Sequence, residues 1–117
     1  TNLRFKQVNS NSVFVDDSSS KYYNCLVTTN EYSGTGCEKT YTQFAVDHTY
    51  NYNIFIEHNG DGETPGLAKA KKGSVITICG WTGTLKPTAG CIDISSTDMV
   101  TLLSYLDSSK NPIIEIS

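Results

Sequence analysis

Short apolar runs alternate with clusters of Gly, Ser, Asn and Asp along most of this chain. The runs are rich in Val, Ile, Thr and aromatic residues, which favour β-strands, and the clusters between them are typical of tight turns. This pattern predicts a mainly β protein. The predicted strands are Ser12–Val15, Tyr22–Thr28, Tyr41–Val46, Tyr52–His58, Ser74–Cys79 and Ile113–Ile116.

Helical periodicity occurs in one segment, Thr97–Leu106, near the C-terminus. Its apolar residues recur at the three- and four-residue spacing of a single helical face. They are Met99, Leu102, Leu103 and Leu106. Ser95 or Ser96 can cap the N-terminus of this helix, because a serine hydroxyl accepts a hydrogen bond from a free backbone amide of the first turn. We expect the apolar face to pack on the sheet.

The length of 117 residues and the hydrophobic content of 38% suit one modest core, so we assign residues 1–117 to a single domain. Residues 1–20 are polar apart from a short apolar stretch, and they form either an additional edge strand or a flexible arm. No apolar run approaches the ~20 residues that cross a bilayer, and the segment that opens with Thr1 lacks the order of a signal peptide. We therefore expect a mature, soluble form with no membrane partner.

Four cysteines form two pairs, and eleven residues separate the members of each pair. No Cys-x-x-Cys motif occurs and no histidine lies close to a cysteine, so the spacing favours disulfides over a zinc site or free cytosolic thiols. Three pairings are open, and we favour Cys25–Cys37 together with Cys79–Cys91. Each bond would stabilise the fold by about 2–4 kcal/mol. Disulfides predict a secreted, extracellular protein, and we expect no metal and no cofactor.

The net charge of −3 and the charged fraction of 18% are mild, which argues against nucleic acid as a partner. The one basic cluster, Lys69, Lys71 and Lys72, is followed by Gly73. This arrangement is typical of a solvated turn rather than a phosphate-binding surface. We expect the protein to be a monomer.

Five local motifs follow one another along the chain. They are Lys21-Tyr22-Tyr23, Gly34-Thr35-Gly36-Cys37, Phe44-Ala45-Val46-Asp47-His48, Ser74-Val75-Ile76-Thr77-Ile78-Cys79 and Gly90-Cys91-Ile92-Asp93-Ile94-Ser95. Together with the helix and the last strand, they resemble the double-psi β-barrel family of small secreted proteins, which includes barwin-like, expansin-like and papain-inhibitor domains. The resemblance implies a small, disulfide-stapled, six-stranded barrel with one short helix near the C-terminus.

The resemblance singles out Asp93, since the matching aspartate acts on polysaccharide in expansin-like and lytic members. Catalytic members carry a second aspartate at the end of the central strand, where this chain has Ile78 and Cys79, so the acid and base pair of the family is incomplete. On a strand, Asp93 would point away from the core if Ile92 and Ile94 point inward. It either contributes to a site or bonds backbone amides ahead of the helix.

Seven tyrosines and one tryptophan exceed what a small core requires, and their rings suit sugar rings or protein partners. Tyr50 and Tyr52 would share one strand face, and Trp81 lies in a Gly-rich segment. His48 is either a hydrogen-bonded structural residue or a part of the same site. The tyrosines also suit a simpler role, in which they cover the sheet.

These features favour a secreted, non-enzymatic binding protein that engages extracellular polysaccharide or cell-wall material. The predicted ligand-binding groove comprises Asp93, Trp81, Tyr50, Tyr52 and His48, and we assign no catalytic residue. One alternative is a protein-binding effector or cysteine-protease inhibitor that contacts a secreted or host protein through the loop Gly80–Gly90. A second is an enzyme that cleaves polysaccharide or RNA, although Glu57 and His58 are adjacent and would point to opposite faces of a strand.

Overall fold

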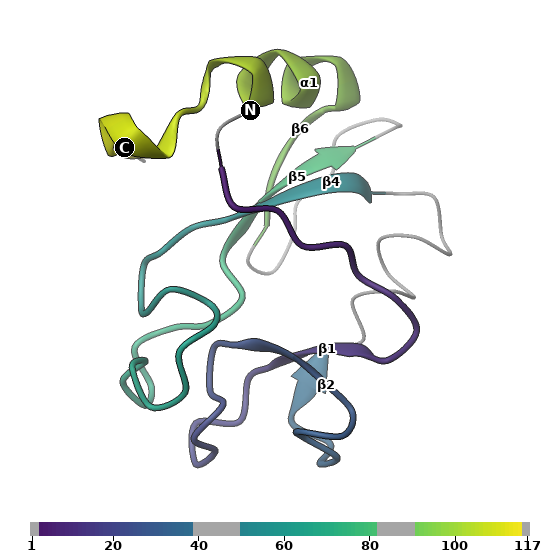
Figure 1. Ribbon diagram of the computed structural model, residues 1–117, viewed down its shortest axis with the longest axis vertical. Coiled ribbons are helices and arrows are strands. Elements are labelled where there is room, and N and C mark those ends of the chain that lie inside the picture. The colour runs from purple at the N-terminus through teal and green to yellow at the C-terminus, as the bar shows by residue number, and fades with distance from the viewer. Residues whose placement is uncertain (1–2, 39–49, 82–90, 116–117) are drawn as a thin grey trace.

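In the computed structural model, residues 3–38, 50–81 and 91–115 are described, and their strands form two three-stranded sheets (Figure 1). The strands are β1 (Ser12–Val15), β2 (Leu26–Thr28), β3 (Cys37–Glu38), β4 (Tyr50–Phe55), β5 (Thr77–Trp81) and β6 (Cys91–Ser95). The helix α1 (Ser96–Tyr105) follows β6 directly, and a short 3-10 helix, η2 (Ser108–Lys110), comes after it. Among the described residues, no helix has the length and apolar character that a membrane span requires.

The first sheet has the strand order β2-β1-β3, and both pairings are antiparallel. All four residues of β1 are buried, so this strand is covered on both faces. Val13 and Val15 of β1 form an apolar cluster with Cys25 and Val27, and the partly buried Tyr22, Tyr32 and Cys37 pack against that cluster. The segment for which the sequence suggests an added edge strand or a flexible arm thus contributes the central strand of a sheet.

The second sheet has the order β4-β5-β6, with β4 antiparallel and β6 parallel to β5. Its register places Ile54, Ile78 and Ile92 side by side, because Ile78 pairs with both of the others. Helix α1 packs on this sheet through Met99, which is fully buried. Gly80 permits the close approach, since a side chain there would begin 3.1 Å from Met99 Cβ.

The ends of α1 follow local hydrogen-bonding rules. Ser95 Oγ accepts a hydrogen bond from the backbone amide of Asp98 at 3.0 Å, and Leu106 donates its backbone N–H to the Leu102 carbonyl at 3.1 Å. The serine cap supplies the acceptor that a first-turn amide otherwise lacks. The helix predicted over Thr97–Leu106 and the cap at Ser95 are therefore confirmed, with bounds that differ by one residue.

A pair of buried asparagines connects the first sheet to the second. Asn24 adopts a left-handed conformation (φ 60°), donates through Nδ2 to the Asn59 carbonyl at 2.5 Å, and accepts from the Val75 amide at 2.9 Å. The Asn59 side chain donates to the carbonyls of Lys69 and Gly73 and accepts from the Lys69 amide, all at 2.9 Å. Each buried amide is thus satisfied by backbone groups that lie far away in the sequence.

The predicted six-stranded barrel is wrong: the described strands form two separate sheets, and neither is closed into a barrel. A barrel requires every strand to pair on both sides, whereas in the described sheets only β1 and β5 have two neighbours. The strand predicted over Ile113–Ile116 is also wrong, since residues 113–115, its described part, form no strand. Asn111 turns the chain through a left-handed conformation (φ 47°), and Ile113 beyond it is 94% exposed.

The other strand predictions differ from the structure mainly at their ends. β1 has the predicted bounds, β2 occupies only the end of Tyr22–Thr28, and β4 and β5 overlap Tyr52–His58 and Ser74–Cys79. Asn24 and Val75 have positive φ angles, which interrupt the extended backbone ahead of β2 and β5. The strand predicted over Tyr41–Val46 lies outside the described residues.

Candidate functional site

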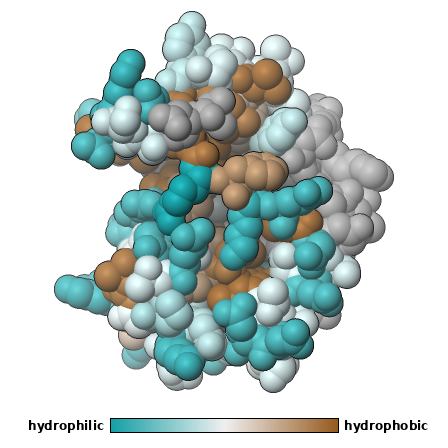
Figure 2. Space-filling view, in the orientation of Figure 1, coloured by the Kyte–Doolittle hydropathy of each residue, from teal (hydrophilic) through white to brown (hydrophobic). Residues whose placement is uncertain are grey.

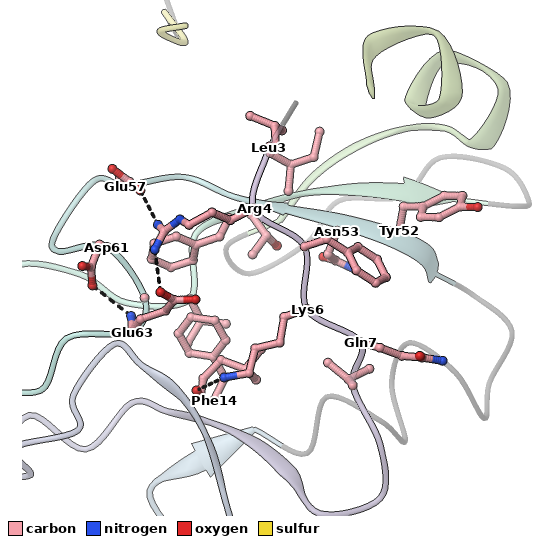
Figure 3. Close-up of a pocket in the computed structure, with 18 of the residues that line it drawn as sticks. Leu3, Arg4, Lys6, Gln7, Phe14, Tyr52, Asn53, Glu57, Asp61 and Glu63 are labelled. Carbon is pink, nitrogen blue, oxygen red and sulfur yellow. Dashed lines mark hydrogen bonds and ion pairs between the residues drawn. The ribbon is translucent and has the colours of Figure 1, made fainter. Parts of the chain in front are cut away.

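A cleft of about 840 Å³ lies beneath the N-terminal segment, residues 3–8, which we call the strap (Figure 3). The cleft, here named the strap cleft, is lined by the strap, by β1 and β2 of the first sheet, by β4 and β5 of the second, by the loop after β4, and by Leu103 of α1. Its volume falls within the ~300–1,000 Å³ that is typical of small-molecule sites. Figure 2 shows apolar surface between the two halves of the molecule, with hydrophilic residues lying across it.

The floor of the strap cleft is aromatic and joins the two sheets. Phe14 of β1 and Phe55 of β4 stack with ring centroids 5.4 Å apart and an angle of 25° between the ring planes. Gly62 lies against the Phe55 ring, since a side chain at position 62 would begin 3.2 Å from Phe55. Gly62 also has φ 79°, a conformation that glycine adopts without the strain of a side chain. The floor is therefore a packed structure rather than a loose gap.

Two further aromatic rings line the strap cleft and remain largely exposed. Phe5 of the strap is 79% exposed and Tyr52 of β4 is 48% exposed. The polar side chains of Gln7 and Asn53 line the cleft with them, and Figure 3 shows Tyr52 and Gln7 at one end of the strap. Rings that the core does not bury keep their faces free for a ligand.

The opposite end of the strap is charged. Arg4 donates through Nη1 to Glu63 Oε2 at 2.5 Å and through Nη2 to Glu57 Oε1 at 3.0 Å (Figure 3). Lys6 donates to the carbonyl of Leu26 at 3.1 Å. The side chains of Arg4, Glu57 and Glu63 are each at least half exposed, so each ion pair contributes little to stability. Together these contacts fix the position of the strap over the cleft.

Asp61 shapes the turn that presents Glu63. Its carboxylate accepts hydrogen bonds from the Thr64 hydroxyl at 2.6 Å and from the backbone amides of Thr64 and Glu63 at 2.7 and 2.9 Å. These bonds, the one from the Thr64 hydroxyl first, lower the pKa of Asp61 from 3.8 to about 2. Asp61 is therefore ionised at neutral pH and committed to the turn.

The groove predicted from the sequence is divided in the structure. Tyr52 lines the strap cleft, whereas Asp93 does not belong to its lining. Tyr50 and Trp81 pair across β4 and β5 through their backbones, but their side chains lie outside the described residues, as does His48. The loop predicted to recognise proteins, Gly80–Gly90, lies beyond the described residues from position 82 onward.

Asp93 lies on β6 directly opposite Cys79 of β5. The alternation of side chains along β6 places it on the other face from Ile92 and Ile94, as the sequence predicts. Both carboxylate oxygens are nevertheless buried, and neither has a hydrogen-bond partner within the described part of the chain. The prediction that Asp93 bonds backbone amides ahead of the helix is therefore wrong among the described residues. The first turn of the helix is capped by Ser95 instead, whose hydroxyl accepts from the Asp98 amide.

Of the two favoured disulfides, one is formed. Cys79 and Cys91 are bonded, with their Cα atoms 6.1 Å apart, whereas Cys25 and Cys37 are free thiols. The predicted Cys25–Cys37 bond is wrong because β1 lies between the two residues: Cys25 precedes β2 on one side of Val15, and Cys37 begins β3 on the other. Two strand spacings separate them, roughly 9–10 Å, which exceeds the reach of a disulfide. Burial raises the pKa of the Cys25 thiol, which therefore packs as a neutral residue.

The histidine and glutamate of the enzyme alternative are held apart by their contacts. His58 Nε2 lies 3.1 Å from the Lys72 carbonyl, and Glu57 binds Arg4. The strap residues Arg4, Phe5 and Lys6 are not predicted at a site, because apolar–polar alternation over only four residues, Leu3 to Lys6, is a weak strand signal and marks no site. The available hint was charge, since Arg4 is the only arginine of the chain and the 57–63 segment carries three acids.

Comparison with known proteins adds no relative to this picture. The chain matches no protein-family model, no curated protein and no solved structure. The resemblance to double-psi β-barrel proteins therefore stays a prediction, and the strap cleft with the groups that line it is the candidate site.

Proposed function

We propose that this protein is a secreted, non-enzymatic binding protein whose strap cleft holds part of an extracellular polysaccharide chain. The observation that carries the proposal is the pair of exposed rings, Phe5 and Tyr52, in one cleft with hydrogen-bonding side chains. Exposed aromatic surface that lines a concave site is a common mark of ligand recognition.

The chemistry of a sugar ring suits these groups. A pyranose has a flat C–H face, which stacks on an aromatic ring, and an edge of hydroxyl groups, which donate and accept hydrogen bonds. Tyr52 and Phe5 supply ring faces, while Asn53 and Gln7 supply amides that can bind the hydroxyl edge. The cleft also extends beneath the whole strap, so it can hold several consecutive units of a chain.

The carboxylates of the strap cleft favour binding over hydrolysis. Glycoside hydrolysis usually requires one carboxyl group that holds a proton and a second that is free to act as base or nucleophile. Glu57 and Glu63 both bind the Arg4 guanidinium, and Asp61 is committed to its turn. Secretion is part of the same proposal, because the Cys79–Cys91 disulfide is typical of proteins in oxidising compartments.

The proposal is tested by retention on insoluble glucans and chitin, followed by titration with soluble oligosaccharides of whichever polymer retains the protein. Tyr52→Ala and Phe5→Ala should each weaken binding roughly fivefold, corresponding to about 1 kcal/mol per stacked ring. Tyr105→Ala is the matched control, because Tyr105 is as exposed as Phe5, at 79%, but lies on α1 outside the cleft lining.

Two results would contradict the proposal. Absence of retention on every polymer would remove polysaccharide as the ligand. Equal loss of binding in Tyr52→Ala and Tyr105→Ala would show that adsorption to exposed rings, rather than the cleft, accounts for the retention.

A further inference from the structure

The face of the second sheet opposite α1 brings sulfur and oxygen atoms together from three strands. The register places Asn53, Cys79 and Asp93 in one row across β4, β5 and β6. Thr77 and Cys91 are neighbours in the next row. One sulfur or carboxylate oxygen from each of Cys79, Cys91 and Asp93 lies within 4.8 Å of the other two.

Two more oxygen atoms approach the same sulfurs. Cys79 Sγ lies 2.9 Å from Asn53 Oδ1 and 3.2 Å from the Thr77 hydroxyl. The Thr77 hydroxyl is also 3.5 Å from Cys91 Sγ. Three oxygen-bearing side chains therefore lie around the two sulfurs, at a place where Cys79 is fully buried and Thr77 is 6% exposed.

This cluster has more hydrogen-bond acceptors than donors. A disulfide sulfur carries no hydrogen, so it cannot donate to Asn53 Oδ1 or to the Asp93 carboxylate. The carboxylate oxygens are buried and lack a partner among the described residues, which is costly for a charged group. Reduction would add two sulfurs that can ionise to thiolates beside this carboxylate, and a cation that binds both sulfur and oxygen would then satisfy all of these groups at once.

We propose that reduction of the Cys79–Cys91 bond creates a binding site for one thiophilic divalent cation such as Zn²⁺, with Cys79, Cys91 and Asp93 as ligands. Zn²⁺ binds cysteine thiolates and carboxylates in four-coordinate sites, and Asn53 Oδ1 or Thr77 Oγ1 is placed to complete the set. The Cα separation of 6.1 Å between the cysteines lets both thiolates reach one ion.

The redox and proton balance of this step is simple. A phosphine reductant breaks the sulfur–sulfur bond, takes an oxygen atom from water and becomes its oxide, while the two sulfurs gain two electrons and the two protons of that water. A dithiol reductant achieves the same result by closing its own disulfide. Zn²⁺ then displaces the two thiol protons, because thiolates are the ligands.

The site is distinct from the proposed polysaccharide function, although the two share a wall. Asn53 and Thr77 line the strap cleft, whereas Cys79, Cys91 and Asp93 do not. Metal binding is read from metal stoichiometry and polysaccharide binding from retention, so failure of one proposal leaves the other intact.

The test uses the Cys25→Ala/Cys37→Ala double variant, so that only the two bridging cysteines remain. The protein is titrated with Zn²⁺ before and after phosphine reduction, and with Co²⁺ to detect sulfur-to-metal charge transfer. We expect one equivalent to bind after reduction only. Asp93→Ala should weaken binding at least tenfold, a lower bound set by the effect of lost outer-shell partners. Asp98→Ala, in the first turn of α1, should leave binding unchanged.

Each other outcome is decisive. Equal binding by the oxidised protein, no binding after reduction, or binding that Asp93→Ala leaves intact would overturn the proposal. If the reduced protein unfolds, Zn²⁺ should restore its near-ultraviolet circular dichroism, since a structural metal supplies folding free energy. Unfolding that Zn²⁺ does not reverse would overturn the proposal as well. Asp93→Asn repeats the comparison with a side chain of the same shape should the alanine variant fail to fold.

Discussion

The two sheets use cysteine pairs of identical spacing in opposite ways. Eleven residues separate Cys25 from Cys37, and eleven separate Cys79 from Cys91, yet only the second pair is bonded. In the first sheet the central strand β1 stands between the two thiols, whereas in the second sheet the cysteines lie on adjacent strands. Strand order, rather than distance along the chain, therefore decides which cysteines can meet.

The two sheets also differ in the residues that pack around their central strands. The first sheet buries all four residues of β1, and two of them, Val13 and Val15, cluster with Val27 and the neutral Cys25 thiol. The second carries isoleucines on the face that meets α1, and its other face combines Phe55 with Asn53, Asp93 and the disulfide. The first sheet thus serves stability, while the second combines stability with groups that can do chemistry.

The largest effect in this comparison is expected from removing the bonded cysteine pair, set against removal of one free thiol from the other pair. Cys79→Ala/Cys91→Ala should lower the free energy of unfolding by about 3 kcal/mol, because the unfolded chain regains the freedom of a closed loop. Cys37→Ala should lower it by less than about 0.5 kcal/mol, since a half-buried thiol leaves only a small gap. Urea denaturation without reductant measures both. A thiol count other than two in the unfolded wild-type protein would contradict the assigned pairing.

A smaller effect is expected from the link between the sheets. Asn24→Gly keeps the left-handed backbone but removes the amide, leaving the Asn59 carbonyl and the Val75 amide unpaired, and should destabilise the protein by about 2 kcal/mol. Asn111→Gly is the matched control, because Asn111 shares the left-handed conformation at an exposed position, and it should cost less than about 0.5 kcal/mol. Equal losses of stability in the two variants, measured by thermal unfolding, would show that the Asn24 side-chain amide does not stabilise the contact between the sheets.

The strap should respond more weakly. Arg4→Gln should lower global stability by less than about 1 kcal/mol, because both of its ion pairs are exposed. Backbone amides of residues 3–8 should nevertheless exchange faster with deuterium, and 1 M salt should produce the same change in the wild-type protein. Lys110→Gln, which removes an exposed cation from η2, serves as the control. Unchanged exchange in Arg4→Gln would show that the ion pairs do not hold the strap.

The smallest expected effect is the acid response of the Asp61 turn. The folded pKa of about 2 lies below the ordinary 3.8, so the ionised carboxylate stabilises the fold above pH 3.8 and this contribution is lost as the pH falls through about 2. The difference in melting temperature between the wild-type protein and Asp61→Asn should therefore shrink over that range. A difference that stays constant with pH would mean that the charge of Asp61 is unimportant to the turn.

Local patterns in the sequence predicted the local structure well. The cap at Ser95 and the spacing of Met99 with the leucines depend only on neighbouring residues, and the structure confirms both. The strand Ser12–Val15 was found for the same reason. Its central place was not, because strand order depends on contacts between distant segments.

The errors arose where long-range contacts decide the structure. A barrel and a Cys25–Cys37 bond both assume a strand order, and cysteine spacing is compatible with several orders. The strap cleft was missed because Arg4 pairs with acids more than fifty residues away, and nothing local marks such a pair. Tyr52 does line the cleft with a half-exposed ring, and its role in binding stays a prediction.

The diagonal bond between Cys79 and Cys91 also determines how the molecule would respond to mechanical force. Tension applied at the two ends would pass through the sulfur bridge and bypass the loop that it closes. The oxidised chain would therefore extend about 35 Å less than the reduced chain, given ~3.5 Å per residue and a bridge that spans 6.1 Å. Strand β4 lies outside the bridged loop, so single-molecule pulling should peel it from the sheet while β5 and β6 stay joined.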